Sequence, residues 1–132
     1  MTRLHENRLA LLRRTRDTWL HENRLALLRR TRALLAQGWT QHVWARPSRN
    51  AIELDPTDRR AGCWCLTGAM RKALGETGKS HPILWVGDLD YLCTLLGFRH
   101  HGHAIVWNDG PSRTKRAVLA RVDKAIAQIE AL

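Results

Sequence analysis

Leucines recur at helical spacing near the start of the chain, and they do so twice. The sequence LHENRLALLRRTR occupies residues 4–16 and returns unchanged at residues 20–32. In the second copy Leu20, Leu27 and Leu34 fall in one row of an ideal helix, which predicts a stripe that faces the core. An offset of sixteen residues turns the first copy by about 160° relative to the second. One straight helix therefore cannot bury both copies against the same core.

The first copy has two predicted arrangements. Either the helix bends near residues 17–19, or the first copy extends outward. An outward helix exposes an apolar stripe, which consists of Leu4, Leu11, Leu12 and Trp19. Such a stripe normally packs against a partner, so we predict a homodimer through residues 4–19 and expect residues 1–16 to be dispensable for folding. Identity over thirteen residues indicates a recent tandem duplication or an artefact of cloning.

Three further helices are predicted from caps and apolar spacing. Asp55 is an N-cap for the first of them, which runs from Pro56 to Leu74. The second covers residues 82–96, where apolar residues recur at spacings of four and three. The last begins after Thr114, another N-cap, and keeps its helical spacing almost to the C-terminus.

Two parts of the chain are not predicted to be helical. Short β-prone pieces at residues 41–44 and 51–54 lie on either side of turn residues, and they predict a small hairpin. Residues 104–107 are apolar and precede an Asn-Asp-Gly-Pro turn. They are compatible with a short strand or with an extended buried connection.

These elements predict a mainly α fold class: a compact bundle of about four helices with a small β-hairpin and an N-terminal helical extension. We assign residues 1–19 to the duplicated basic helical extension and residues 20–132 to a single helix-rich domain. No apolar run approaches the length of a membrane span, and charges interrupt the N-terminal leucines, unlike in a secretory signal. We expect a cytoplasmic protein with reduced cysteines and no membrane partner.

The net charge of the chain favours negatively charged partners. The 22 Lys and Arg residues outnumber the 12 Asp and Glu residues, and the formal net charge is +10. Residues 1–35 hold nine arginines and three acidic residues, a net +6. This bias favours nucleic acid or an acidic protein surface, and a solvated helix face is the alternative. Two tryptophans among arginines are suited to stacking on bases. The candidate binding residues are Arg13, Arg14, Arg16, Arg29, Arg30, Arg32, Trp39, Trp44 and Arg46.

Cysteine and histidine residues suggest two kinds of chemistry. Cys63 and Cys65 with the HHGH sequence at residues 100–103 contain the ligand types of a zinc site. Two cysteines two positions apart on a helix diverge, however, so we predict no metal and no cofactor.

The second kind is hydrolysis, with Cys65 as nucleophile, His103 as base, and Asn108 or Asp109 as the group that orients the base. A nucleophilic cysteine of this kind opens a helix, whereas the predicted helix places Cys65 near its middle. We therefore expect Cys65 to be a buried, un-ionised thiol.

Several short motifs carry a resemblance. They are GWTQ at residues 38–41, WCLTGAM at 64–70, WND at 107–109 and VLARVDKAI at 118–126. In this order and spacing they resemble a family of small uncharacterised bacterial and phage proteins, the domain of unknown function six-one-nine-seven. The resemblance begins near Leu20 and leaves out the first LHENRLALLRRTR copy. It implies a compact helix-rich fold and names no activity.

Together these features lead to one expectation and one alternative. We expect a non-catalytic basic accessory protein of phage or prophage type. It would bind a polyanion or a larger protein through its Arg-rich N-terminal helix. The alternative is a small Cys/His hydrolase. The first is favoured because the +6 segment and the misaligned leucine face are present, whereas the hydrolase requires a different helix boundary.

Overall fold

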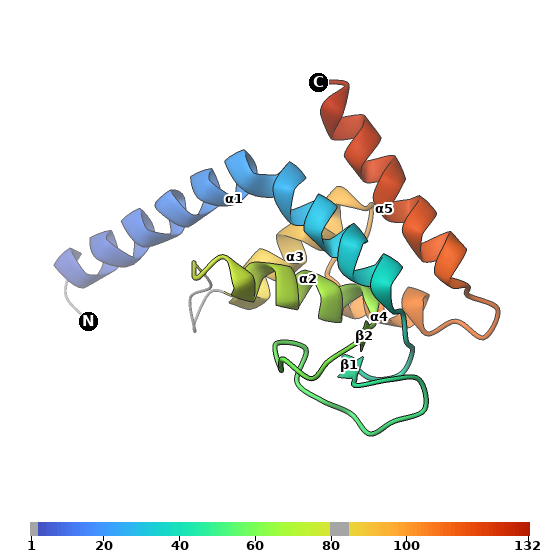
Figure 1. Ribbon diagram of the computed structural model, residues 1–132. Coiled ribbons are helices and arrows are strands. Elements are labelled where there is room, and N and C mark those ends of the chain that lie inside the picture. Colours follow the sequence, from blue (N-terminus) through green and yellow to red (C-terminus); the bar gives the residue numbers. More distant parts are fainter. Residues whose placement is uncertain (1–2, 80–84) are drawn as a thin grey trace.

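The computed structural model of the chain describes residues 3–79 and 85–132. These residues form α1 (Arg3–Gln37), β1 (Ala45–Arg46), β2 (Cys63–Trp64), α2 (Leu66–Glu76), α3 (Trp85–Leu95), α4 (His101–Asn108) and α5 (Lys115–Glu130). α2 contacts α1, α3 and α4, and α1 also contacts α5 (Figure 1). The predicted fold class, a mainly helical bundle with a small hairpin, is confirmed.

Both copies of the repeat lie in one helix, α1, whose axis changes direction near its middle (Figure 1). Thr15 Oγ1 donates to the carbonyl of Leu11 at 2.9 Å, and Thr18 Oγ1 donates to the carbonyl of Arg14 at 3.0 Å. Hydroxyls that bond back to the preceding turn bend helices. The chain therefore bends close to the predicted residues 17–19, and the first copy also projects away from the body.

The first copy is exposed, but not as far along the chain as predicted. Leu4 and Leu11 are 61% and 60% exposed. Arg16 is buried, and Trp19 packs against the core, so the prediction that Trp19 belongs to the exposed stripe is wrong. The free part of the extension ends at Thr15. The homodimer through residues 4–19 stays a prediction.

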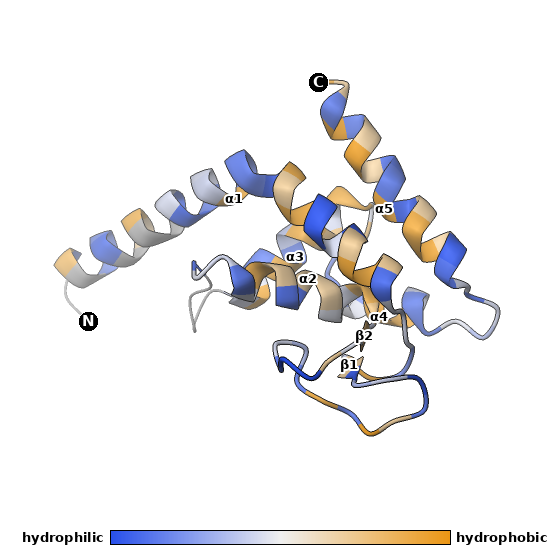
Figure 2. Cartoon of the chain, in the orientation of Figure 1, coloured by the Kyte–Doolittle hydropathy of each residue, from blue (hydrophilic) through white to orange (hydrophobic). Residues whose placement is uncertain are grey.

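The helices enclose one apolar core. In the second copy Leu20, Leu27 and Leu34 are buried as the pattern predicts, and Leu28 and Leu35 lie beside them. Apolar and charged residues alternate along α1 and α5, as is typical of helices with one buried face (Figure 2). The core is completed by side chains of the other helices, among them Met70, Leu74, Leu89, Leu92, Val118 and Val122.

The predicted helix from Pro56 is wrong, because α2 begins at Leu66. The Asp55 carboxylate accepts from the N–H of Thr57 at 2.8 Å, which closes a turn instead of capping a helix. The chain then enters β2, where Trp64 pairs with Ala45 of β1. Pairing with a distant strand has overridden the local helix signal.

The hairpin and the segment before the WND motif also differ from the predictions. β1 lies just after the predicted piece 41–44, and the second piece supplies only an isolated bridge from Leu54 to Ala45. Residues 104–107 are helical, and not extended, because they belong to α4. The His100 side chain caps α4 by accepting from the N–H of His103 at 3.3 Å.

The remaining predictions for the helices have clear outcomes. Thr114 caps α5 by accepting from the N–H of Ala117, so the last helix is confirmed. α3 corresponds to the predicted helix 82–96, although its predicted start at Pro82 lies outside the described residues. The side chains of Leu12 and Arg13, which belong to α1, are also outside the described part of the structure. In the described part of the chain, no helix combines the length and the apolar character that crossing a bilayer requires.

Candidate functional site

Three segments far apart in the sequence meet around the side chain of Asn108, which is fully buried. Its Oδ1 accepts from Trp39 Nε1 at 2.8 Å and from the N–H of Leu66 at 3.1 Å. Its Nδ2 donates to the carbonyl of Thr40 at 3.2 Å and to Asp109 Oδ1 at 3.0 Å. One amide thus uses its full bonding capacity to join the GWTQ, WCLTGAM and WND motifs.

The loop after α1 is held in place by the same network. Gln41 Nε2 donates to the carbonyls of Asn108 and Gly110, both at 2.9 Å. The Asp109 carboxylate accepts from the N–H of His42 at 2.8 Å. His42 has a φ of 72°, in the left-handed region that residues other than glycine rarely adopt. The surrounding hydrogen bonds therefore maintain a loop conformation that the backbone alone does not favour.

A pocket of about 790 Å³ opens beside this loop. Trp39, Gln41 and His42 form part of its wall, and the cations Arg46, Arg49 and Lys115 also line it. Among the described residues that line it, none is Asp or Glu. We call this site, whose lining is completed by Gly38, Thr40, Asn50 and Cys63, the basic pocket. Its lining has the composition of a binding site for anions.

Two of its cations are fixed and the third is exposed. Arg46 Nε donates to Thr40 Oγ1 at 3.0 Å, and its terminal nitrogens donate to backbone carbonyls. Lys115 Nζ donates to the carbonyl of Ala36 at 2.7 Å, near the C-terminal end of α1. Arg49 is exposed. The basic pocket thus combines positioned positive charge with a cation free to follow a ligand.

The motif segments around Asn108 are shared with a described family. A family model, "Family of unknown function (DUF6197)", matches residues 21–128, which include all three segments. The chain belongs to the DUF6197 family. This match confirms the resemblance, and it leaves the first repeat copy outside. No curated protein and no solved structure matches the chain.

Most of the predicted binding arginines of the DUF6197 protein are engaged within the fold. Three of the four arginines of the second copy pair with carboxylates of α2 and α5, as Arg29–Glu130 at 3.1 Å, Arg30–Glu76 at 2.7 Å and Arg32–Asp123 at 3.0 Å. Arg16 pairs with Asp88. These pairs connect α1 to α2, α3 and α5, and they reduce the charge that is available to a ligand.

The other predicted binding residues lie in different places. Trp39 and Arg46 line the basic pocket. Trp44 lines a different pocket, which also contains Glu53 and Asp55 and so does not suit a polyanion. Arg14 is exposed on the extension. Arg13 is also a predicted binding residue, and its side chain lies outside the described part of the structure.

Cys65 occupies a different position from the predicted one. It is the N-cap of α2, and its Sγ accepts from the N–H of Gly68 at 3.3 Å. The prediction that Cys65 lies in mid-helix is wrong, while the prediction that it is buried is confirmed. Burial raises the pKa of the Cys65 thiol, so the N-terminal position does not make it a ready nucleophile.

His103, the predicted base, faces a different group of residues. Its Nδ1 accepts from the N–H of Arg99 at 3.3 Å, and its ring packs edge-on against Phe98. Asn108 and Asp109, the predicted orienting groups, bind the loop after α1 instead. In the described residues, moreover, no group of three His, Cys, Asp or Glu residues is placed to hold a metal ion.

The thiols should differ strongly in reactivity. Cys63 is partly exposed beside the basic pocket, whereas Cys65 and Cys93 are buried, and burial raises the pKa of Cys93 to about 12. We expect iodoacetamide at neutral pH to modify Cys63 at least tenfold faster than the other two, because Cys63 is accessible and burial disfavours the thiolate form of Cys65 and Cys93. Peptide mass spectrometry over time measures this. Alkylation of Cys65 first would contradict the buried thiol.

The sequence alone did not single out Arg49, Lys115 or His42 as members of one site. Arg49 lies in a stretch that contains arginines and Trp39. This mixture of arginine and tryptophan is the one sequence feature that indicates a binding role for Arg49. Lys115 comes from α5, more than sixty residues further along the chain. Only the packing of α5 against the end of α1 brings it to the basic pocket.

Proposed function

We propose that this DUF6197 protein is a non-catalytic binding protein for a polyanion, with single-stranded nucleic acid as the preferred ligand. The observation that supports the proposal is the basic pocket, where Arg46, Arg49 and Lys115 line a volume of about 790 Å³ and no described lining residue is acidic. Arginine and lysine side chains contact phosphate oxygens without regard to base sequence. The proposed binding surface is therefore the loop after α1, and not the arginine-rich repeat.

Trp39 adds a reason to favour single strands. It lines the basic pocket, and its Nε1 is bonded to Asn108, so the orientation of its ring is set before any ligand arrives. Aromatic side chains beside cations are suited to unpaired bases, because each base presents a face for stacking. In a duplex those faces are covered. We therefore expect single strands to bind more tightly than duplexes of equal length.

The test is fluorescence anisotropy of a labelled oligonucleotide at several salt concentrations. Arg49→Ala should weaken binding and make the log–log salt dependence shallower by about 0.7, the value for one lost phosphate contact on a single strand. The matched control is Arg59→Ala, because Arg59 is exposed and does not line the basic pocket. Equal effects of the two substitutions would contradict a specific role for the basic pocket.

The N-terminal extension provides a second comparison. Arg3, Arg8 and Arg14 are exposed on it and add positive charge, so deletion of residues 1–15 should weaken binding moderately. If the deletion abolishes binding while Arg49→Ala has no effect, the arginine-rich helix is the binding surface instead. If neither change has an effect, the protein does not bind a polyanion in this way.

A further inference from the structure

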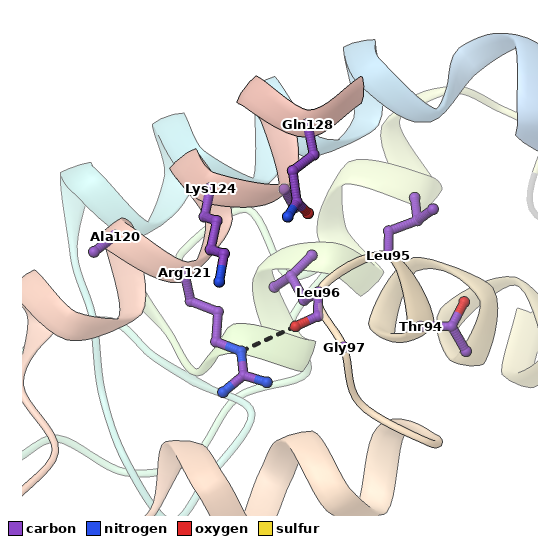
Figure 3. A pocket seen from close by; sticks show the side chains of 9 residues that line it. Thr94, Leu95, Leu96, Gly97, Ala120, Arg121, Lys124 and Gln128 are labelled. Atoms are coloured by element: carbon purple, nitrogen blue, oxygen red, sulfur yellow. Dashed lines mark hydrogen bonds between the residues drawn. The ribbon is translucent and has the colours of Figure 1, made fainter. Parts of the chain in front are cut away.

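A second pocket, of about 630 Å³, lies between the end of α3 and α5 (Figure 3). From α5 the side chains of Arg121, Lys124 and Gln128 extend towards the turn at Leu96 and Gly97 (Figure 3). Among the described residues that line this pocket, none is Asp or Glu. We call it the α3–α5 pocket.

Arg121 is fixed at the edge of this pocket, and the other described residues use only part of its guanidinium. Its Nε donates to the carbonyl of Leu96 at 3.0 Å. The centre of the guanidinium lies 4.1 Å from the ring of Phe98 and 4.9 Å from the ring of Trp107. This bond uses one nitrogen of the guanidinium, while the aromatic rings hold the plane of the group. Such a pre-oriented guanidinium loses little entropy when it binds an oxyanion.

Several positive charges lie near Arg121, and among the described residues that line the pocket none carries a negative charge. Arg113 also stacks on Trp107, with its guanidinium 4.0 Å from the ring. Burial, and then the charge of Arg113, lowers the pKa of Arg121, so its positive charge is less stabilised than that of a fully solvated arginine. Asp123 precedes Lys124 but pairs with Arg32 at 3.0 Å. An anion in the pocket would relieve this repulsion.

We propose that the α3–α5 pocket binds a phosphate group. A phosphate monoester carries close to two negative charges at neutral pH, which matches the two cations Arg121 and Lys124, whereas a carboxylate carries one. The Arg121 guanidinium and the Gln128 amide supply directed donors, and Lys124 supplies a mobile charge.

This site is distinct from the basic pocket. Lys115 and Lys124 are nine residues apart on α5, so their side chains leave the helix on sides about 180° apart. A ligand of the α3–α5 pocket is therefore not the same phosphate that the basic pocket would contact. Phosphate binding in the α3–α5 pocket and polyanion binding in the basic pocket are independent properties, and either can be absent while the other is present.

Isothermal titration calorimetry with inorganic phosphate at low ionic strength tests the proposal. The titrations use the Arg49→Ala protein, so that the basic pocket contributes less. We expect saturable binding that Lys124→Ala weakens about tenfold, the loss of one charge-assisted contact. Arg116→Ala is the matched control, since Arg116 is exposed on the same helix and does not line the α3–α5 pocket.

Further titrations compare phosphate with other anions. A conservative variant ensures that a loss of binding is not caused by unfolding. Glycerol phosphate should bind at least as well as inorganic phosphate, and acetate should bind much more weakly. Arg121→Lys keeps the charge but loses the planar fork, and it should also weaken phosphate binding. The proposal is overturned if phosphate does not saturate, if acetate equals phosphate, or if Lys124→Ala and Arg116→Ala have equal effects.

Discussion

Replacing Arg16 by methionine should lower the free energy of unfolding by about 3–5 kcal/mol, because it leaves the Asp88 carboxylate buried without its cation. The side chains of Arg16 and Asp88 are only 8% and 3% exposed. Arg16 Nε donates to Asp88 Oδ2 at 2.8 Å, and the guanidinium also lies 4.5 Å from the ring of Trp19. Urea unfolding followed by circular dichroism measures the loss.

Two controls distinguish the effect of losing the Arg16–Asp88 pair from the effect of replacing any arginine on α1. Arg14→Met changes an exposed arginine two residues earlier and should alter stability by less than about 0.5 kcal/mol. The double substitution Arg16→Met with Asp88→Leu should recover most of the stability, because it removes both charges together. If Arg16→Met costs no more than Arg14→Met, the buried pair does not stabilise the fold.

Two N-terminal truncations test the same contact between Arg16 and Asp88. Deleting residues 1–15 removes the part of the first copy whose described side chains are all exposed, and the melting temperature should change little. Deleting residues 1–16 removes one residue more, Arg16, and should cause most of the loss expected for Arg16→Met. The sequence suggested that residues 1–16 are dispensable as a block. The buried contact to Asp88 places the boundary one residue earlier.

The helices that were predicted correctly have strong local signals. The apolar spacing of the second copy and the Thr114 cap of α5 are each contained within a few turns of helix. The start of α2 was predicted wrongly because Asp55 and Pro56 form a good cap sequence and yet close a turn. What decides between these outcomes is the pairing of Trp64 with Ala45, a contact across the chain that no local pattern contains.

The candidate site was predictable only in fragments. The motifs around Trp39, Cys65 and Asn108 were recognisable one by one, but their convergence depends on hydrogen bonds between residues up to 69 positions apart. Charge counting located the arginine-rich helix, but it could not show which arginines are already paired. The acidic partners of the second copy, such as Asp123, lie far along the chain.

Replacing Asn108 by alanine should have a comparably large effect, a loss of about 3–5 kcal/mol. The substitution leaves the Trp39 Nε1–H and the Leu66 N–H without their acceptor and the Thr40 carbonyl without its donor. Each buried polar group left unsatisfied costs about 1–3 kcal/mol, and the costs overlap because the groups share one site. Denaturant unfolding measures the change.

The matched control is Asn23→Ala. Among the described residues, the Asn23 amide bonds to the carbonyl of Trp19 within α1, and it is only partly buried, so its loss should cost less than about 1 kcal/mol. Asn108→Asp is the informative intermediate, because it keeps the acceptor for Trp39 but loses both donated bonds and places a second carboxylate beside Asp109. Equal stability of the Asn108→Ala and Asn23→Ala proteins would show that the buried amide does not hold the three motifs together.

The same substitution connects the fold to the proposed function. Asn108 fixes Trp39 and Thr40, and both residues line the basic pocket, so Asn108→Asp should weaken oligonucleotide binding even under conditions where the protein remains folded. Asn23→Ala should not. Because Asn108 is buried and cannot itself touch a ligand, such a loss would come from the loop that it positions. Unchanged binding by folded Asn108→Asp protein would mean that the pocket does not depend on this network.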